Sequence, residues 1–141
     1  MENNMKLEFQ SKSQNEGFAR AAVAAFVSQL DPTLEELADI KTAVSEAVTN
    51  AIVHGYGHTN GIVTITCQLI HKKAEITISD TGRGIEDIAL ATQPLYSYSK
   101  DTERSGMGFT VMETFMDSMS VESSPGKGTM VTLTKEIGTE S

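Results

Sequence analysis

The sequence predicts a single-domain α+β fold, in which helices cover one face of a mixed, mostly antiparallel sheet. Three observations support this prediction. The chain has 141 residues, which is enough for one domain over residues 1–141. The spacing of apolar residues changes along the chain between the helical period and the strand period. Strand-like runs also come in adjacent pairs joined by short turns, which makes a two-layer sandwich the simplest architecture.

The chain is expected to open with a strand and a helix. Residues 6–9 alternate between charged and apolar side chains, as a half-buried strand does. Ser13 and Glu16 have the spacing of a capping box, which predicts the start of a first helix. Its apolar stripe comprises Phe18, Ala19, Ala22, Val23, Phe26, Val27 and Leu30.

A second, longer helix is expected to follow the break at Asp31 and Pro32. Thr33 and Glu36 form another capping-box pattern, and Gly55 is expected to close the helix. Its buried stripe is predicted to include Leu34, Leu37, Ile40, Val44 and Val48.

The second half of the chain is predicted to contain four strands and one helix. Runs 63–69 and 74–78 alternate as the two strands of a hairpin do, and an irregular stretch follows them. A helix is expected over residues 107–116, and two closing strands over 118–123 and 129–135. Methionines recur near this helix and are interpreted as core filling: Met107, Met112, Met116 and Met119.

Composition excludes several classes of function. Eleven Lys and Arg against nineteen Asp and Glu give a net charge of −8, the wrong sign for binding through nucleic-acid phosphates. The single cysteine, Cys67, is incompatible with an intramolecular disulfide and fits a reducing compartment. No apolar run reaches the length of a membrane span, and residues 1–9 do not resemble a signal peptide. We expect a cytoplasmic protein that contacts neither nucleic acid nor membrane directly.

Three polar residues share one face of the second predicted helix. Glu46, Asn50 and His54 are spaced four apart, on a stripe rotated away from the apolar one. An ordinary solvent-facing helix side explains this pattern as well. However, asparagine is a poor residue inside a helix, and an amide oxygen beside a carboxylate suits a hard cation that also binds phosphates.

Two glycine-containing segments are further candidates for a binding site. Asp80-Thr81-Gly82-Arg83-Gly84 follows a predicted strand, where a carboxylate can accept from an exocyclic amino group and glycines let the backbone approach a flat ring. Ser105-Gly106-Met107-Gly108 opens a predicted helix, whose free N–H groups can hold phosphate oxygens. A plain turn and a plain helix start explain each segment equally well. The P-loop, the dinucleotide-binding glycine motif and the protein-kinase motifs are all absent from the sequence.

Taken together and in order, these segments resemble the N, G1 and G2 boxes of the GHKL superfamily of ATPases and kinases. The matching motifs are Glu46-x-x-x-Asn50-x-x-x-His54-Gly55, Asp80-x-Gly82-x-Gly84, Gly106-x-Gly108 and Gly128-Thr129. The resemblance covers nearly the whole chain. Finer stretches are similar to the anti-sigma F factors of endospore-forming bacteria: residues 13–20, 30–33, 45–51 and 103–109.

The resemblance implies an ATP or ADP site with Mg²⁺. Asn50 would coordinate the Mg²⁺ ion, and Glu46 would act as general base on an incoming serine hydroxyl. Asp80 would accept from the adenine amino group, with Thr129 near the same edge. Arg104 would supply positive charge to the γ-phosphate. The remaining binding residues would be Gly82 and Gly84 around adenine, and Ser105, Gly106, Met107 and Gly108 around the phosphates. Residues 85–104 would form an ATP lid.

The resemblance also implies partners. A homodimer with ATP would hold sigma factor F, and a STAS-type anti-anti-sigma protein would displace it and be phosphorylated on a serine. Glu16 and Arg20 would contact these partners, although a solvated helix face explains Arg20 equally well. Three alternatives remain open: the ATP-binding half of a histidine kinase, an anti-sigma B-type or switch kinase, and a nucleotide-binding anti-sigma module without kinase turnover.

Overall fold

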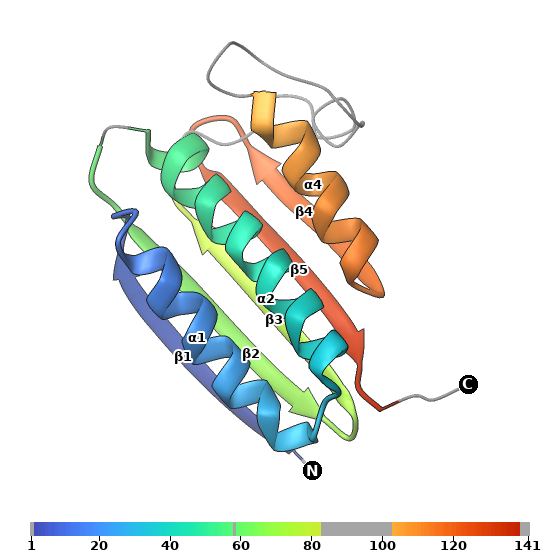
Figure 1. Cartoon of the computed structure of the whole chain (residues 1–141). Helices are drawn as coiled ribbons and strands as arrows, with labels where there is room; N and C mark the ends of the chain where they lie inside the picture. Colours follow the sequence, from blue (N-terminus) through green and yellow to red (C-terminus); the bar gives the residue numbers. More distant parts are fainter. Residues whose placement is uncertain (1, 58, 83–102, 139–141) are drawn as a thin grey trace.

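The computed structural model describes residues 2–57, 59–82 and 103–138, and the side chains of residues 103–108 are outside this description. Helices lie on one face of a sheet, so the predicted two-layer α+β fold is confirmed (Figure 1). The strands are β1 (Glu2–Gln10), β2 (Ile62–Ile70), β3 (Lys73–Asp80), β4 (Ser118–Ser124) and β5 (Gly128–Glu136). The helical elements are α1 (Asn15–Val27), η1 (Ser28–Leu30), α2 (Leu34–Thr49), η2 (Asn50–Tyr56) and α4 (Glu103–Phe115).

The sheet has five strands in the order β1-β2-β3-β5-β4. Every pairing within the described residues is antiparallel, which is the predominant arrangement that the sequence predicts. The register of β2 and β3 pairs Ile70 with Lys73, and the turn between them contains His71 with a φ of 56°. The pairing of β3 with β5 places Asp80 opposite Thr129 at one end of the sheet.

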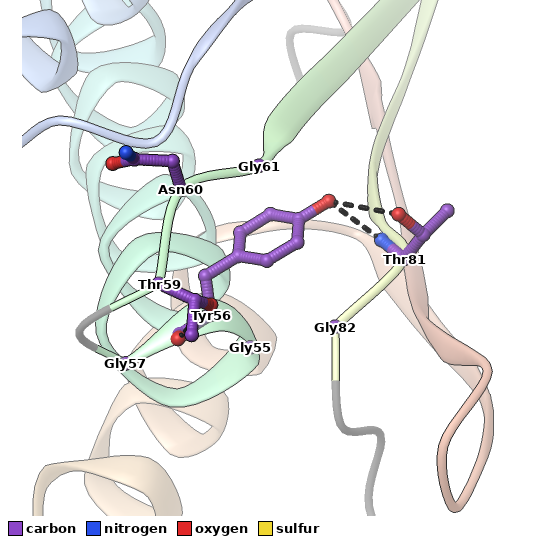
Figure 2. A pocket seen from close by; sticks show the side chains of 8 residues that line it. All are labelled: Gly55, Tyr56, Gly57, Thr59, Asn60, Gly61, Thr81 and Gly82. Carbon is purple, nitrogen blue, oxygen red and sulfur yellow. Dashed lines mark hydrogen bonds between the residues drawn. The ribbon is translucent and has the colours of Figure 1, made fainter.

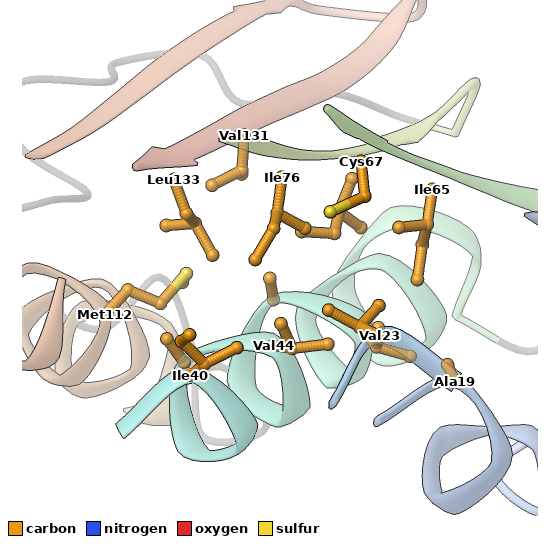
Figure 3. Close-up of a cluster of buried hydrophobic side chains, with 14 of the residues drawn as sticks. Ala19, Val23, Ile40, Val44, Ile65, Cys67, Ile76, Met112, Val131 and Leu133 are labelled. Atoms are coloured by element: carbon orange, nitrogen blue, oxygen red, sulfur yellow. The ribbon is translucent and has the colours of Figure 1, made fainter. Parts of the chain in front are cut away.

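The core fills the space between the helices and the covered face of the sheet. Figure 3 shows side chains of β2, β3 and β5 directed toward side chains of α1, α2 and α4. The single cysteine, Cys67, lies fully buried among them, and burial raises the pKa of its thiol to about 12. Met112 and Met116 are also buried, which confirms their interpretation as core residues. Within the described residues, no helix is long and apolar enough to cross a membrane.

The structure corrects the predicted start of α1. Gln14 is the N-cap residue and makes no side-chain capping bond, so the capping box expected at Ser13 is absent. The carboxylate of Glu16 instead accepts from the Ser45 hydroxyl and pairs with Arg20. Phe18, expected in the apolar stripe, is 56% exposed, because the sheet-facing side of the helix contains Ala19 instead.

The two ends of α2 differ in structure. The predicted capping box at the start is confirmed: Thr33 Oγ1 accepts from the Glu36 N–H, and a Glu36 oxygen accepts from the Thr33 N–H. Leu34, in the first turn, is exposed rather than buried. At the other end the α-helix stops at Thr49, and the chain continues as a π-helix through η2. The wider π-helical turn was not predicted from the apolar spacing.

Candidate functional site

The end of α2 and the start of η2 place two of the predicted site residues one turn apart. Glu46 and Asn50 are both partly buried, and the Asn50 backbone N–H bonds to the Glu46 carbonyl. The amide nitrogen of Asn50 is buried and has no hydrogen-bond partner among the described residues. Buried polar groups are normally paired, so this amide is available to a ligand. His54 follows on the same segment, in the last turn of η2.

Asp80 ends β3 and is a buried residue, with only 8% of its surface exposed. Its Oδ1 accepts from the Gly82 N–H at 2.9 Å, and its carboxylate also accepts from the backbone of Thr129. Burial raises the pKa of Asp80, and these two backbone hydrogen bonds oppose the rise. A carboxylate has about four acceptor positions, so the group can still accept a hydrogen bond from a ligand.

Three backbone segments approach Asp80 closely, and each has a glycine at the point of contact, where a Cβ would not fit. A Cβ on Gly55 would lie 2.8 Å from the Asp80 carboxylate, and one on Gly82 would lie 2.0 Å from the Gly55 carbonyl oxygen. A Cβ on Gly128, whose φ is +97°, would lie 2.0 Å from the Asp80 carbonyl oxygen. Gly55 and Gly128 were not among the predicted site residues. The sequence contained a signal for both, since each belongs to a motif that carries the resemblance.

Tyr56 is a further residue that sequence analysis missed. It forms part of a hollow of about 480 Å³ that adjoins Asp80 through Gly55 and Gly82. Figure 2 shows the ring extending from η2 toward Thr81. The lining residues are Gly55, Tyr56, Gly57, Thr59, Asn60, Gly61, Thr81 and Gly82. No sequence pattern distinguishes Tyr56, because its contacts depend on how the loop after η2 folds.

The structure describes the other predicted nucleotide-site residues only in part. Gly84 and the part of the expected lid before residue 103 lie outside the described residues. Arg104 and residues 105–108 lie in α4, which begins at Glu103 and therefore earlier than predicted. Ser105 and Gly106 are in its first turn, where backbone N–H groups have no intrahelical partner. Met107 and Gly108 lie in the next turn.

The two predicted partner residues lie on α1, apart from the Asp80 cluster. Arg20 and Glu16 form an ion pair at 3.2 Å, in which the Arg20 side chain is 43% exposed. Glu16 also accepts a hydrogen bond from Ser45, the residue directly before Glu46 on α2. The ion pair is therefore anchored to α2, the helix that contains Glu46 and ends just before Asn50.

The side chains near Asn50 limit the kind of metal ion that this region can hold. The described residues contain no group of three or more His, Cys, Asp or Glu side chains that could hold a metal ion. The unpartnered atom of Asn50 is the amide nitrogen, which donates and cannot bind a cation. The amide oxygen of the same side chain, one turn from the Glu46 carboxylate, fits an ion that takes only a few protein ligands. Mg²⁺ behaves in this way, because it keeps several waters and binds substrate phosphates. The residues present therefore fit Mg²⁺ bound together with a phosphate group.

Comparison with known proteins identifies similar sequences and folds. Residues 9–135 match the family described as "Histidine kinase-like ATPase domain". The chain is 61% identical over 138 residues to the anti-sigma F factor of Thermoanaerobacter sp. (strain X514), covering 98% of this chain and 96% of that protein. It is 60% identical over 136 residues to the anti-sigma F factor of Caldanaerobacter subterraneus subsp. tengcongensis, covering 96% and 95% of the two chains.

Two solved structures share the fold. The RsbU and RsbW domains of Rv1364c from Mycobacterium tuberculosis align with a TM-score of 0.67 and 20% identity, over 96% of this chain and 32% of that chain. This chain thus spans about a third of that longer protein. The catalytic domain of the histidine kinase ThkA aligns with a TM-score of 0.58 and 12% identity, over 94% and 98% of the chains. At these identities the likeness shows the fold alone.

Proposed function

We propose, from the premise that this chain belongs to the family of histidine kinase-like ATPase domains, that it is an anti-sigma factor with kinase activity. In this proposal it sequesters sporulation sigma factor F in the cytoplasm. With ATP and Mg²⁺ it phosphorylates a serine of a STAS-type anti-anti-sigma protein. The observation that carries the nucleotide-binding part is the nearly buried Asp80 carboxylate, enclosed by backbone at Gly55, Gly82 and Gly128.

The base of the nucleotide is assigned to the end of β3. The backbone at Gly55 packs against Gly82, where a Cβ would not fit, and this contact encloses Asp80. The partly desolvated Asp80 carboxylate would accept from the exocyclic amino group of adenine. Thr129 supports this carboxylate through its backbone and lies opposite Asp80 in the register of β3 and β5. Gly84 is assigned to the same pocket by its place in the sequence motif.

The phosphates are assigned to the space between η2 and the start of α4. Asn50 would hold Mg²⁺, which supplies charge neutralisation to the phosphates when bound. The charge of Arg104 and the backbone N–H groups of Ser105 and Gly106, in the first turn of α4, would contact phosphate oxygens. Met107 and Gly108 follow in the next turn, where backbone N–H groups bond within the helix, so they would lie near the phosphates without donating to them. Glu46, one turn before Asn50, would orient the serine hydroxyl and take its proton as the oxygen attacks the γ-phosphate.

The partner surface is assigned to α1. Arg20 offers a partly exposed guanidinium that Glu16 holds in place, and Ser45 fixes Glu16 to α2. A guanidinium presented in this way suits a carboxylate on a protein partner. The names of the relatives at about 60% identity support a sigma factor as that partner. We also propose that the chain acts as a homodimer.

Incubation with γ-labelled ATP, Mg²⁺ and a candidate STAS protein tests the kinase assignment. We expect acid-stable label on a serine of the STAS protein. Acid-labile label on a histidine would indicate histidine kinase chemistry instead. Absence of transfer together with tight ATP binding would indicate a nucleotide-binding anti-sigma module without turnover.

Pull-down of sigma factor F tests the partner assignment. Arg20→Glu should weaken capture of the sigma factor while ATP binding stays intact, because Arg20 lies apart from Asp80. Lys41→Glu is a matched control on the exposed part of α2. Equal capture by the Arg20 variant and the parent would contradict the assignment. Stronger capture of sigma factor B than of sigma factor F would favour an anti-sigma B-type kinase.

A further inference from the structure

We infer that Tyr56 is a positioning residue for base selection: its hydroxyl fixes the Thr81 backbone and so holds the Gly82 N–H against Asp80. This inference rests on the proposed function, because it assigns Tyr56 a part in the recognition of adenine by Asp80. The Tyr56 hydroxyl acts on the Asp80 carboxylate indirectly, through the backbone of Thr81 and Gly82.

The Tyr56 hydroxyl joins two segments that are distant in sequence. It donates to the Ile62 carbonyl oxygen at 2.6 Å and accepts from the Thr81 N–H at 2.8 Å. The Thr81 hydroxyl lies 3.1 Å away. Because the single Tyr56 proton is directed to Ile62, the Thr81 hydroxyl is the donor in this third contact. One phenolic oxygen therefore organises the start of β2 and the end of β3 (Figure 2).

The ring itself is also held in place. A Cβ on Gly61 would lie 2.2 Å from a Tyr56 ring carbon, so the loop backbone packs directly against the ring. On the other side, Gly55 precedes Tyr56 in η2 and its carbonyl oxygen lies against Gly82. Tyr56 is thus fixed between the loop and the turn that follows β3.

Tyr56 would affect base selection through the hydrogen bond from the Gly82 N–H to Asp80. Thr81 lies between Asp80 and Gly82, and the Gly82 N–H donates to Asp80 Oδ1 at 2.9 Å. When the Tyr56 hydroxyl fixes the Thr81 N–H, it also restricts the peptide that follows and the direction of the Gly82 N–H. This bond directs Asp80 Oδ1, so losing the Tyr56 hydroxyl should let the carboxylate rotate. A rotated carboxylate distinguishes an amino group from a carbonyl oxygen less well.

Calorimetric titration with ADP and with inosine diphosphate, both with Mg²⁺, tests this inference. The two nucleotides differ at the position where adenine has its amino group and hypoxanthine has a carbonyl oxygen. We expect the parent to prefer ADP, and Tyr56→Phe to reduce the ratio of the two affinities by about tenfold, as the loss of one well-placed hydrogen bond would. Thr81→Ala is the matched control, because it removes the Thr81 hydroxyl but keeps the N–H, and its ratio should stay near that of the parent.

The outcomes separate this inference from the proposed function. A parent that binds neither nucleotide overturns the proposed function, and this inference with it. A parent that prefers ADP, with a Tyr56→Phe variant that keeps the same preference, overturns the inference alone. Equal weakening of both nucleotides also overturns it, because that result indicates only a structural role. Hydrogen exchange gives a second measurement: the Thr81 and Gly82 amides should exchange faster in Tyr56→Phe, and unchanged exchange there would contradict the mechanism.

Discussion

The two ends of α2 differ in how their polar groups are hydrogen-bonded. At the start, Thr33 and Glu36 satisfy each other's backbone, and the second Glu36 oxygen accepts from the Gly138 N–H. At the other end the helix widens into η2, and the buried Asn50 amide has no partner in the part of the chain that the structure describes. The first end is completed by the chain itself, and the second has a buried N–H donor without a partner among the described residues.

Further contacts strengthen the contrast. Near the start of α2, Lys135 forms an ion pair with Asp39 at 3.6 Å and donates to the Phe115 carbonyl oxygen at the end of α4. A cation at the C-terminal end of a helix is stabilising. Near the other end, Asp80 is buried against the backbone at Gly55 and Gly128. Stability is therefore concentrated at one end of α2 and proposed function at the other.

The largest effect is expected from Glu46→Gln, near the end of α2 where we propose the phosphate site. Phosphoryl transfer should fall by about 100-fold or more, because the proposed general base is lost, while nucleotide affinity is retained. Single-turnover assays with labelled ATP measure the rate. Glu35→Gln, at an exposed position near the start of α2, is the matched control and should transfer at the parental rate. Equal rates for the Glu46 variant and the parent would refute the role of the base.

Gly82→Ala should show how closely the backbone packs at the functional end. The added Cβ would lie 2.0 Å from the Gly55 carbonyl oxygen, so the free energy of unfolding should fall by about 2 kcal/mol. Gly17→Ala on α1 is the control, since its Cβ meets nothing closer than 3.7 Å. That variant should gain about 0.5 to 1 kcal/mol through helix propensity. Urea unfolding measures both changes, and a stable Gly82→Ala protein would contradict the described contact.

Thr33→Ala should destabilise the start of α2 without changing nucleotide binding at the other end of the helix. Loss of the capping bond to the Glu36 N–H should lower the free energy of unfolding by about 1 kcal/mol. Nucleotide affinity, measured by calorimetry, should not change. A loss of affinity comparable to the loss of stability would show that the two ends are coupled, and the contrast drawn between them would fail.

The smallest effect is a difference in pH dependence. Burial raises the pKa of Asp80, so its contribution to stability is greatest below the ordinary aspartate pKa and is lost as pH rises through the raised value. Hydrogen bonding to the Thr33 backbone lowers the pKa of Glu36, so its contribution is present above the ordinary glutamate pKa and is lost as pH falls through the lowered value.

Urea unfolding across the acidic range distinguishes these signs. Relative to the parent, Asp80→Asn should become more stable as pH rises, whereas Glu36→Gln should become less stable. The Glu36 effect should be small, because this group is only partly buried and solvent screens its interactions. Parallel curves for the parent and Asp80→Asn would contradict the raised pKa of Asp80.

Much of the fold follows from the sequence pattern. Alternation predicts the strands, and the capping box at Thr33 and Glu36 correctly predicts the start of α2. The same pattern at Ser13 and Glu16 fails, because Glu16 bonds to Ser45 of another helix. A local pattern predicts correctly only where no distant partner competes for the same side chain.

The candidate site is predictable to a different degree. The glycine motifs indicate where backbone segments can approach, and the structure places Gly55, Gly82 and Gly128 around Asp80. The contacts of Tyr56 were not predictable, because they join residues brought together only by the fold of the loop after η2. The π-helical turn of η2 was also missed, since apolar spacing does not distinguish it from an α-helix over so short a segment.

Cys67 gives the molecule a built-in reporter of opening. Its thiol is completely enclosed between the sheet and the helices, and its pKa of about 12 keeps it protonated at neutral pH. A thiol reagent can therefore reach it only when the two layers separate. Since the chain has one cysteine, the labelling rate follows a single event. Any ligand that binds the closed form should slow this labelling in proportion to its occupancy, whichever surface of the protein it contacts.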